Sequence, residues 1–193
     1  TPLNMLSSSA KVYWRAREAR VDKTKIKIGA DAHQLSRSEQ SKPRVIILVV
    51  GETVRAVNWG LNGYRRQTTP ELAKRDVINF NQVTSCGTTT AVSLPCMFSP
   101  YGMHAYNSKK INQTESLLHL LTHTNISVLW RDNQSGCKGV CDDSMVEELN
   151  VDDLCKNGRC FDEVLLHQLQ ERIISKKGDQ LIVLHMLGNH GPA

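Results

Sequence analysis

The stretch RVIILVVGET contains the feature that most constrains the fold. Residues 45–50 form an uninterrupted run of six apolar residues, most of them β-branched, between Pro43 and Gly51. So short a run, bounded in this way, predicts a strand rather than a helix. Because both of its faces are apolar, we expect a strand covered on both sides, as in a parallel sheet. The length of 193 residues, of which 40% are hydrophobic, suits one domain with a sizeable core.

Further apolar patterns alternate between strand and helix character. Strands are expected at 77–83, at 126–133 and from residue 179 onward, and helices at 3–20, 116–124 and 161–177. Residues 21–43 are polar and basic, which indicates a surface segment. The alternation predicts an α/β fold with a largely parallel sheet and helices on both faces.

The charge balance limits the partners only loosely. The net charge of +5 is compatible with an anionic partner such as a phosphate group or a membrane surface, and we expect no nucleic-acid partner. The sequence contains no apolar run of about 18 residues, the length that a transmembrane helix requires.

The chain has six cysteines with local spacings of C-x9-C, C-x3-C and C-x4-C: Cys86, Cys96, Cys137, Cys141, Cys155 and Cys160. A zinc site would favour C-x2-C pairs with matching histidines, and no such pair occurs. The spacing therefore favours disulfides over a zinc site, and disulfides indicate an oxidising compartment outside the cytosol.

The sequence contains two candidate catalytic residues, one directly after the first predicted strand and one just before a predicted helix. Glu52 comes directly after the apolar run, where a carboxylate is costly unless it is paired or binds a metal; the alternative is a cap for the next helix. Thr90 ends the CGTTT segment and precedes AVSLPCMF, which could begin a helix. A hydroxyl there faces backbone N–H groups that suit a phosphate, although a simple helix cap is the commoner role.

Three basic residues add to the candidate site. His185 and His190 lie at and beyond the end of the last predicted strand. Each histidine alone could be structural, but the two histidines together with Glu52 after the first strand favour a metal or phosphate site. Lys138, within SGCKGVC, is either solvated or a phosphate contact. From the residues themselves we predict an extracytoplasmic α/β domain with a candidate metal-assisted hydroxyl nucleophile.

Five segments, in order, carry a resemblance to a known family: VVGETVRAVNWGLNGYRRQTTPEL, SCGTTTAVSLPCMFS, DNQSGCKGVCD, CFDEVLLHQL and LHMLGNHGP. From about Val45 to its end the chain resembles the lipid A phosphoethanolamine transferases of the alkaline phosphatase/sulfatase superfamily, which can confer polymyxin resistance. The resemblance implies an alkaline phosphatase/sulfatase-like fold. It also implies that 1–43 are a bridging helix and surface linker and that 44–193 are the N-terminal part of a periplasmic catalytic domain.

The resemblance also implies roles for particular residues. Thr90, rather than the two threonines before it, matches the nucleophile, and Glu52 and Thr90 match zinc ligands. Ser135, Lys138 and His190 match residues that hold the phosphoethanolamine group. The cysteines match family disulfides, for which we expect Cys86–Cys96 and, with other pairings open, Cys137–Cys141 and Cys155–Cys160.

The implied reaction transfers phosphoethanolamine from phosphatidylethanolamine to a lipid A phosphate through a zinc-assisted phosphoethanolamine-threonine intermediate. Family members are periplasmic domains of Gram-negative inner-membrane proteins, so we expect a membrane tether through an N-terminal transmembrane block missing from this chain. Two alternatives stay open: a related zinc phosphodiesterase or sulfatase-type hydrolase, although the C/S-x-P-x-R sulfatase signature is absent, and a non-catalytic fragment that binds head groups. Because the family's later Asp-His zinc ligands lie beyond Ala193, we expect this chain alone to be inactive.

Overall fold

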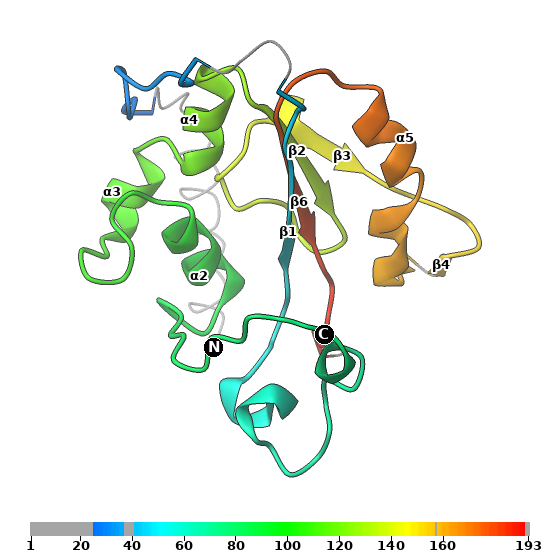
Figure 1. Cartoon of the computed structure of the whole chain (residues 1–193). Coiled ribbons are helices and arrows are strands. Elements are labelled where there is room, and N and C mark those ends of the chain that lie inside the picture. Colours follow the sequence, from blue (N-terminus) through cyan, green and yellow to red (C-terminus); the bar gives the residue numbers. More distant parts are fainter. Residues whose placement is uncertain (1–24, 37–40, 157, 192–193) are drawn as a thin grey trace, which may run out of the picture.

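The structure is a computed structural model that describes residues 25–36, 41–156 and 158–191 (Figure 1). Within these residues a four-stranded sheet has the order β1-β6-β2-β3, with parallel neighbours throughout, and β4 and β5 form an antiparallel hairpin. The strands are β1 (Val45–Val50), β2 (Ser127–Asp132), β3 (Val146–Glu148), β4 (Cys155–Lys156), β5 (Arg159–Cys160) and β6 (Gln180–His185).

Helices flank the sheet on both sides, as the sequence predicted. Figure 1 shows α2, α3 and α4 beside one face and α5 beside the other. The α-helices are α2 (Thr90–Met97), α3 (Ser108–Asn112), α4 (Leu117–His123) and α5 (Leu169–Ile174). Short 3-10 helices are η1 (Ala56–Asn58), η2 (Gly60–Asn62), η3 (Leu72–Lys74), η4 (Asp143–Met145) and η5 (Asp162–Leu166). None of the helices in the described residues combines the length and apolar character needed to cross a membrane.

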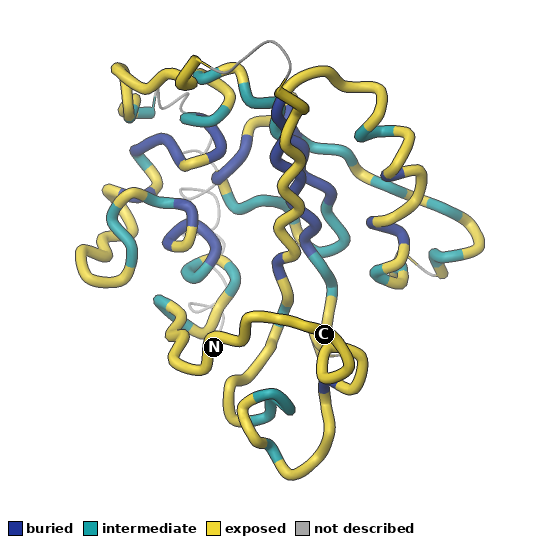
Figure 2. The backbone as a smooth tube through the Cα atoms, viewed as in Figure 1, coloured by how far each residue is buried: buried dark blue, intermediate teal, exposed yellow. Residues whose placement is uncertain are grey.

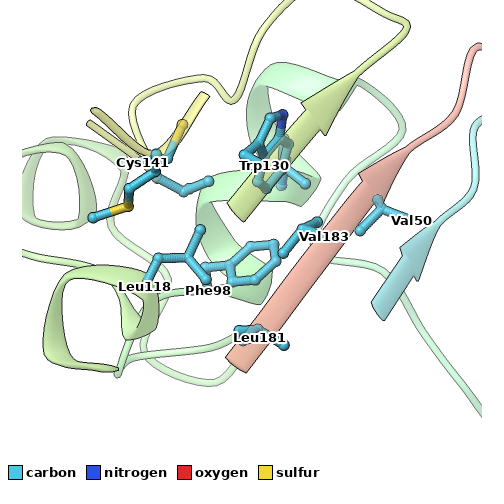
Figure 3. Packing of buried hydrophobic residues seen from close by; sticks show 10 residues of the cluster. Val50, Phe98, Leu118, Trp130, Cys141, Leu181 and Val183 are labelled. Carbon is cyan, nitrogen blue, oxygen red and sulfur yellow. The ribbon is translucent and has the colours of Figure 1, made fainter. Parts of the chain in front are cut away.

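Two hydrophobic cores lie on opposite faces of the sheet, because successive strand residues point to opposite sides. Trp130 and Val183 pack with Phe98 and Leu118 in the core beneath α2 and α4 (Figure 3). Their strand neighbours point the other way: Leu129, Ile182 and Leu184 pack with Val164, Leu165 and Leu169 of η5 and α5. The central strand β6 is buried along its whole length.

Parallel pairing brings the carboxyl ends of three strands to one edge of the sheet. His185 at the end of β6 is in register with Val50 of β1 and with Asp132 of β2. The loops that follow these strands therefore start side by side, where ligands bind in open α/β sheets.

The strands expected at 45–50, at 126–133 and after residue 179 are confirmed, as is the helix at 116–124. The burial expected of the first strand is wrong. In β1 only Val50 is buried, whereas Ile46 and Val49 are 61% and 55% exposed (Figure 2). The reason is that little packs against the faces of β1: among the described residues only its Val50 belongs to a hydrophobic core. β1 is also an edge strand, which pairs with β6 alone in this part of the chain.

Two further elements differ from the prediction. Residues 77–83 alternate like a strand, but they pair with no strand in the described part of the chain and form an exposed loop. The single helix expected at 161–177 is divided into η5 and α5, because Gln168 adopts a left-handed conformation with φ of 49°. The helix expected at 3–20 lies outside the described residues, so the boundary at 43 stays a prediction.

Candidate active site

Glu52 forms the centre of the candidate site. One of its carboxylate oxygens, Oε2, accepts hydrogen bonds from Thr90 Oγ1 at 2.8 Å and from Gln134 Nε2 at 3.0 Å. The other, Oε1, accepts one from Thr53 Oγ1 at 2.9 Å. Burial would raise the pKa of Glu52, but these hydrogen bonds and the nearby His190 outweigh it, so the pKa lies below its ordinary value. Glu52 is thus an ionised acceptor and does not cap a helix.

The local structure around α2 selects one threonine from the CGTTT segment. Thr89 is the N-cap of α2, with extended backbone, and Thr90 is the first helical residue. The Cys86–Cys96 disulfide ties the loop before the helix to the helix's last turn. As a result Thr90 is partly buried against Glu52, while Thr88 and Thr89 are exposed. The hydroxyl expected to be the nucleophile is the one that meets the carboxylate.

The loop after β2 connects the predicted phosphate-binding residues to this pair. Ser135 Oγ donates to Gln134 Oε1, and Lys138 Nζ donates to Ser135 Oγ at 2.6 Å. The chain of contacts therefore runs from Lys138 through Ser135 and Gln134 to Glu52. The Cys137–Cys141 disulfide closes the loop in which Lys138 lies.

The turn after β6 brings His190 to the same edge. The backbone N–H of Asn189 donates to the backbone oxygen of Glu52 at 3.4 Å. At Gly188, which has φ of +54°, a Cβ atom would lie 3.0 Å from that same oxygen, so the close approach requires glycine. His190 itself is exposed and contacts the Gly191 carbonyl, and its ring is close enough to lower the pKa of Glu52.

One carboxylate holds two of these loops in place. Asp162 accepts hydrogen bonds from the backbone N–H groups of Leu187 at 2.7 Å and Gly188 at 2.9 Å. It also accepts one from Asn133 Nδ2 at 2.8 Å. Asp162 therefore joins the loop that carries Ser135 to the turn that carries His190.

His185, the other histidine that the sequence suggested, is part of the core instead. It is fully buried, contacts the Trp130 ring edge-on, and its Nδ1 lies 2.7 Å from Asp132 Oδ1. Its Nε2 has no hydrogen-bond partner among the described residues. Burial would raise the pKa of Asp132, but hydrogen bonds from His185, Trp130 and Gly136 lower it to about 2.

The donors present fit part of a zinc site. A carboxylate and a threonine oxygen that point toward each other are hard ligands of a type that zinc accepts, whereas a catalytic zinc takes three protein ligands. The described residues contain no group of three or more His, Cys, Asp and Glu side chains that could hold a metal. Glu52 and Thr90 are therefore suited to supply two ligands and would need others from elsewhere.

Gln134 and Asp162 were missed by sequence reasoning. Gln134 directly precedes Ser135 in DNQSGCKGVCD, so that motif could have indicated it. Asp162 lies in CFDEVLLHQL, where its position relative to other polar residues does not mark it as functional. Its role arises only when loops that are distant in sequence meet in the fold. The three disulfides, Cys86–Cys96, Cys137–Cys141 and Cys155–Cys160, are the expected pairs.

Comparison with known proteins gives consistent results. The family described as Sulfatase matches residues 44–193. The chain is 46% identical to phosphoethanolamine transferase EptA of Escherichia coli K12 over 184 residues, which cover 93% of this chain and 34% of the relative. It is 40% identical to phosphatidylethanolamine transferase Mcr-1 of Escherichia coli over 188 residues, 92% of this chain and 35% of the relative.

Solved structures show the same relationship. The integral membrane lipooligosaccharide phosphoethanolamine transferase A from Neisseria meningitidis superposes with a TM-score of 0.82 at 39% identity, covering 100% of this chain and 36% of that one. The soluble domain of that enzyme gives a TM-score of 0.74 at 44% identity, and the match covers 81% of this chain and 48% of that domain's chain. The chain thus spans about a third of the length of the curated relatives it matches. Since the family match covers most of the chain and the fold agrees, this chain belongs to the sulfatase family.

Proposed function

We propose that this chain is the part of a periplasmic phosphoethanolamine transferase that carries the nucleophile, Thr90. The observation that supports this most directly is the 2.8 Å hydrogen bond from Thr90 Oγ1 to Glu52. Of the three threonines in the segment, only this hydroxyl is turned toward an ionised carboxylate at the ligand-binding edge of the sheet. The similarity to EptA and Mcr-1 favours phosphoethanolamine as the transferred group.

The proposed reaction has two displacements. Thr90 Oγ1 attacks the phosphorus of phosphatidylethanolamine; the bond from phosphorus to the glycerol oxygen breaks, and diacylglycerol leaves with a proton. A phosphate oxygen of lipid A then attacks the phosphorus of the threonine ester, and the bond from phosphorus to Thr90 Oγ1 breaks. The proton of the attacking phosphate group passes to Thr90 Oγ1 and restores its hydroxyl. Atoms and charges balance without an oxidant or reductant.

Each group in the site has a function in this scheme. Glu52 orients the Thr90 hydroxyl and accepts its hydrogen bond. Lys138, next to Ser135 in the loop that leads back to Glu52, compensates negative charge on the phosphoryl oxygens, and His190 borders the same site. A zinc ion held by Glu52 and Thr90 would lower the pKa of the hydroxyl and neutralise charge on the phosphoryl group.

The transferase as a whole is proposed to be tethered to the inner membrane by a segment outside this chain. A zinc phosphodiesterase would use the same first displacement, with water in place of lipid A. The similarity to named transferases favours transfer over hydrolysis.

The test is a comparison of threonine variants in a polypeptide extended to the length of the relatives. Thr90→Ala should abolish transfer, because it removes the hydroxyl. It should leave folding intact, because only one methyl group is lost with the hydroxyl from a side chain that is partly buried. Thr89→Ala, whose side chain makes no capping hydrogen bond, is the matched control and should retain most activity. Equal losses in both variants would exclude Thr90 as the specific nucleophile.

A further inference from the structure

A pocket of about 510 Å³, lined by both polar and apolar groups, adjoins the candidate active site. Ser135 and His190 line it on the side of the site, and Glu148 and Arg159 line it from the end of β3 and from the β4–β5 hairpin. Gln134 also lines it, and Gln134 donates to the same Glu52 oxygen that accepts the Thr90 hydrogen bond. Two hydrogen-bonded side chains, Gln134 and Glu52, therefore link a ligand in this pocket to the nucleophile.

A disulfide and two hydrogen bonds link parts of the pocket walls to one another. The Cys155–Cys160 disulfide closes the hairpin that presents Arg159. Asn133 Nδ2 ties the hairpin to the loop after β2 through the Cys160 carbonyl at 3.1 Å, and it also donates to Asp162. Walls linked in this way reduce the ordering cost of binding, which is typical of a specific site.

The lining is suited to a phosphorylated sugar. Arg159 is exposed and forms no ion pair with another described residue, so its guanidinium can bind a phosphate through two parallel hydrogen bonds. Gln134, Ser135 and Glu148 offer the donors and acceptors that sugar hydroxyls need. The diacylglycerol part of the donor is apolar and offers no hydrogen-bond or charge partner to these polar side chains.

We propose that this pocket binds the phosphorylated saccharide of the acceptor, with Arg159 as the anchor for an acceptor phosphate. The proposal rests on the proposed transferase function and adds a place for the second substrate. It separates the two substrates: phosphoethanolamine lies at Thr90, Ser135 and Lys138, and the acceptor sugar lies between Ser135 and the hairpin. The meningococcal relative, whose name specifies a lipooligosaccharide, is consistent with a saccharide acceptor.

The first test uses this chain itself, independent of activity. Glucosamine 1-phosphate is titrated into the isotope-labelled chain and followed by two-dimensional NMR. Saturable shifts are expected at Ser135 and in the β4–β5 hairpin. Arg159→Ala should weaken binding about tenfold, the loss expected for one charge-assisted contact, and Arg159→Lys less. Lys156→Ala, which removes a charge from the same hairpin outside the pocket lining, should change affinity less than about twofold.

Several results of the titration would overturn the proposal. These are no saturable shifts around the pocket, equal losses in Arg159→Ala and Lys156→Ala, or inorganic phosphate binding as tightly as the sugar phosphate. The last result would reveal a simple anion site.

The second test separates the half-reactions in the extended enzyme. Arg159→Ala should release diacylglycerol at the wild-type rate and show a KM for lipid A raised about tenfold with little change in kcat. If diacylglycerol release falls in parallel, the pocket serves the donor and the proposal is wrong. If the wild-type enzyme releases no diacylglycerol, the transferase function fails, and the NMR titration alone decides whether the pocket binds a sugar phosphate.

Discussion

Removing the Asp162 carboxylate should loosen the edge of the sheet at which the candidate site is built. Asp162→Ala leaves three donors without their acceptor: the backbone N–H groups of Leu187 and Gly188 and the Asn133 amide. These donors belong to the two loops that carry Ser135 and His190. The substitution therefore disturbs the relation between two parts of the site without touching Thr90 or Glu52.

The magnitude follows from the number and exposure of these hydrogen bonds. A hydrogen bond to a charged group contributes about 1.5–3 kcal/mol. Gly188 is exposed and Leu187 is half-buried, so water replaces part of what is lost. We expect a loss of about 3 kcal/mol in the free energy of unfolding, which lowers Tm by roughly 10 °C for a chain of this size. Asp162→Asn keeps one acceptor oxygen and should lose about half as much.

Thermal and urea unfolding, followed by circular dichroism, measure this loss. Glu163→Ala is the matched control, because Glu163 is the next residue of η5, is exposed and forms no hydrogen bond or ion pair with another described residue. Its Tm should stay within about 2 °C of wild type. The reasoning is refuted if Asp162→Ala is no less stable than Glu163→Ala.

Three further predictions concern acid stability, disulfides and metal binding. The pKa of Asp132 is lowered to about 2 from an ordinary 3.8. The resulting contribution of about 2 kcal/mol is therefore fully present above about pH 4 and is lost as pH falls toward 2. Urea unfolding should show this acid loss in wild type and a weaker one in Asp132→Asn, and equal slopes would contradict it. No free thiol should react in the folded chain, and two reactive cysteines in a thiol assay would contradict the pairing. Replacing Cys86 and Cys96 with alanine should lower the free energy of unfolding by about 3 kcal/mol on chain-entropy grounds. The chain alone should lose zinc on dialysis and show no transfer, whereas the extended polypeptide should retain zinc, as measured by elemental analysis. Stoichiometric zinc in both polypeptides would show that Glu52 and Thr90 need no further ligands.

The central strands could be predicted from the sequence because their apolar runs are local signals. β6 and β2 have neighbours on both sides, so the burial expected from their apolar residues is what the structure has. β1 has an equally apolar run yet is exposed, because burial depends on what packs against a strand, which the run itself does not specify. The same holds for 77–83, where alternation without a pairing partner among the described residues gives an exposed loop.

The candidate site was predictable as a set of residue types and less so as an arrangement. The family resemblance indicated Glu52 and Thr90, and the geometry brings them together. His185 has the same chemistry as His190, but its position on a central strand turns it into the core toward Asp132. Asp162 could not be found in advance, because its three donors are 25, 26 and 29 residues away along the chain.

The most direct test of the central claim is to trap the proposed ester on Thr90. The extended enzyme is mixed with phosphatidylethanolamine, quenched with acid, digested and examined by mass spectrometry. One phosphoethanolamine group is expected on the peptide that contains Thr90, absent from Thr90→Ala and removed when lipid A is added before quenching. A modified Thr89, or turnover in Thr90→Ala at the wild-type rate, would contradict the assignment of Thr90 as the nucleophile.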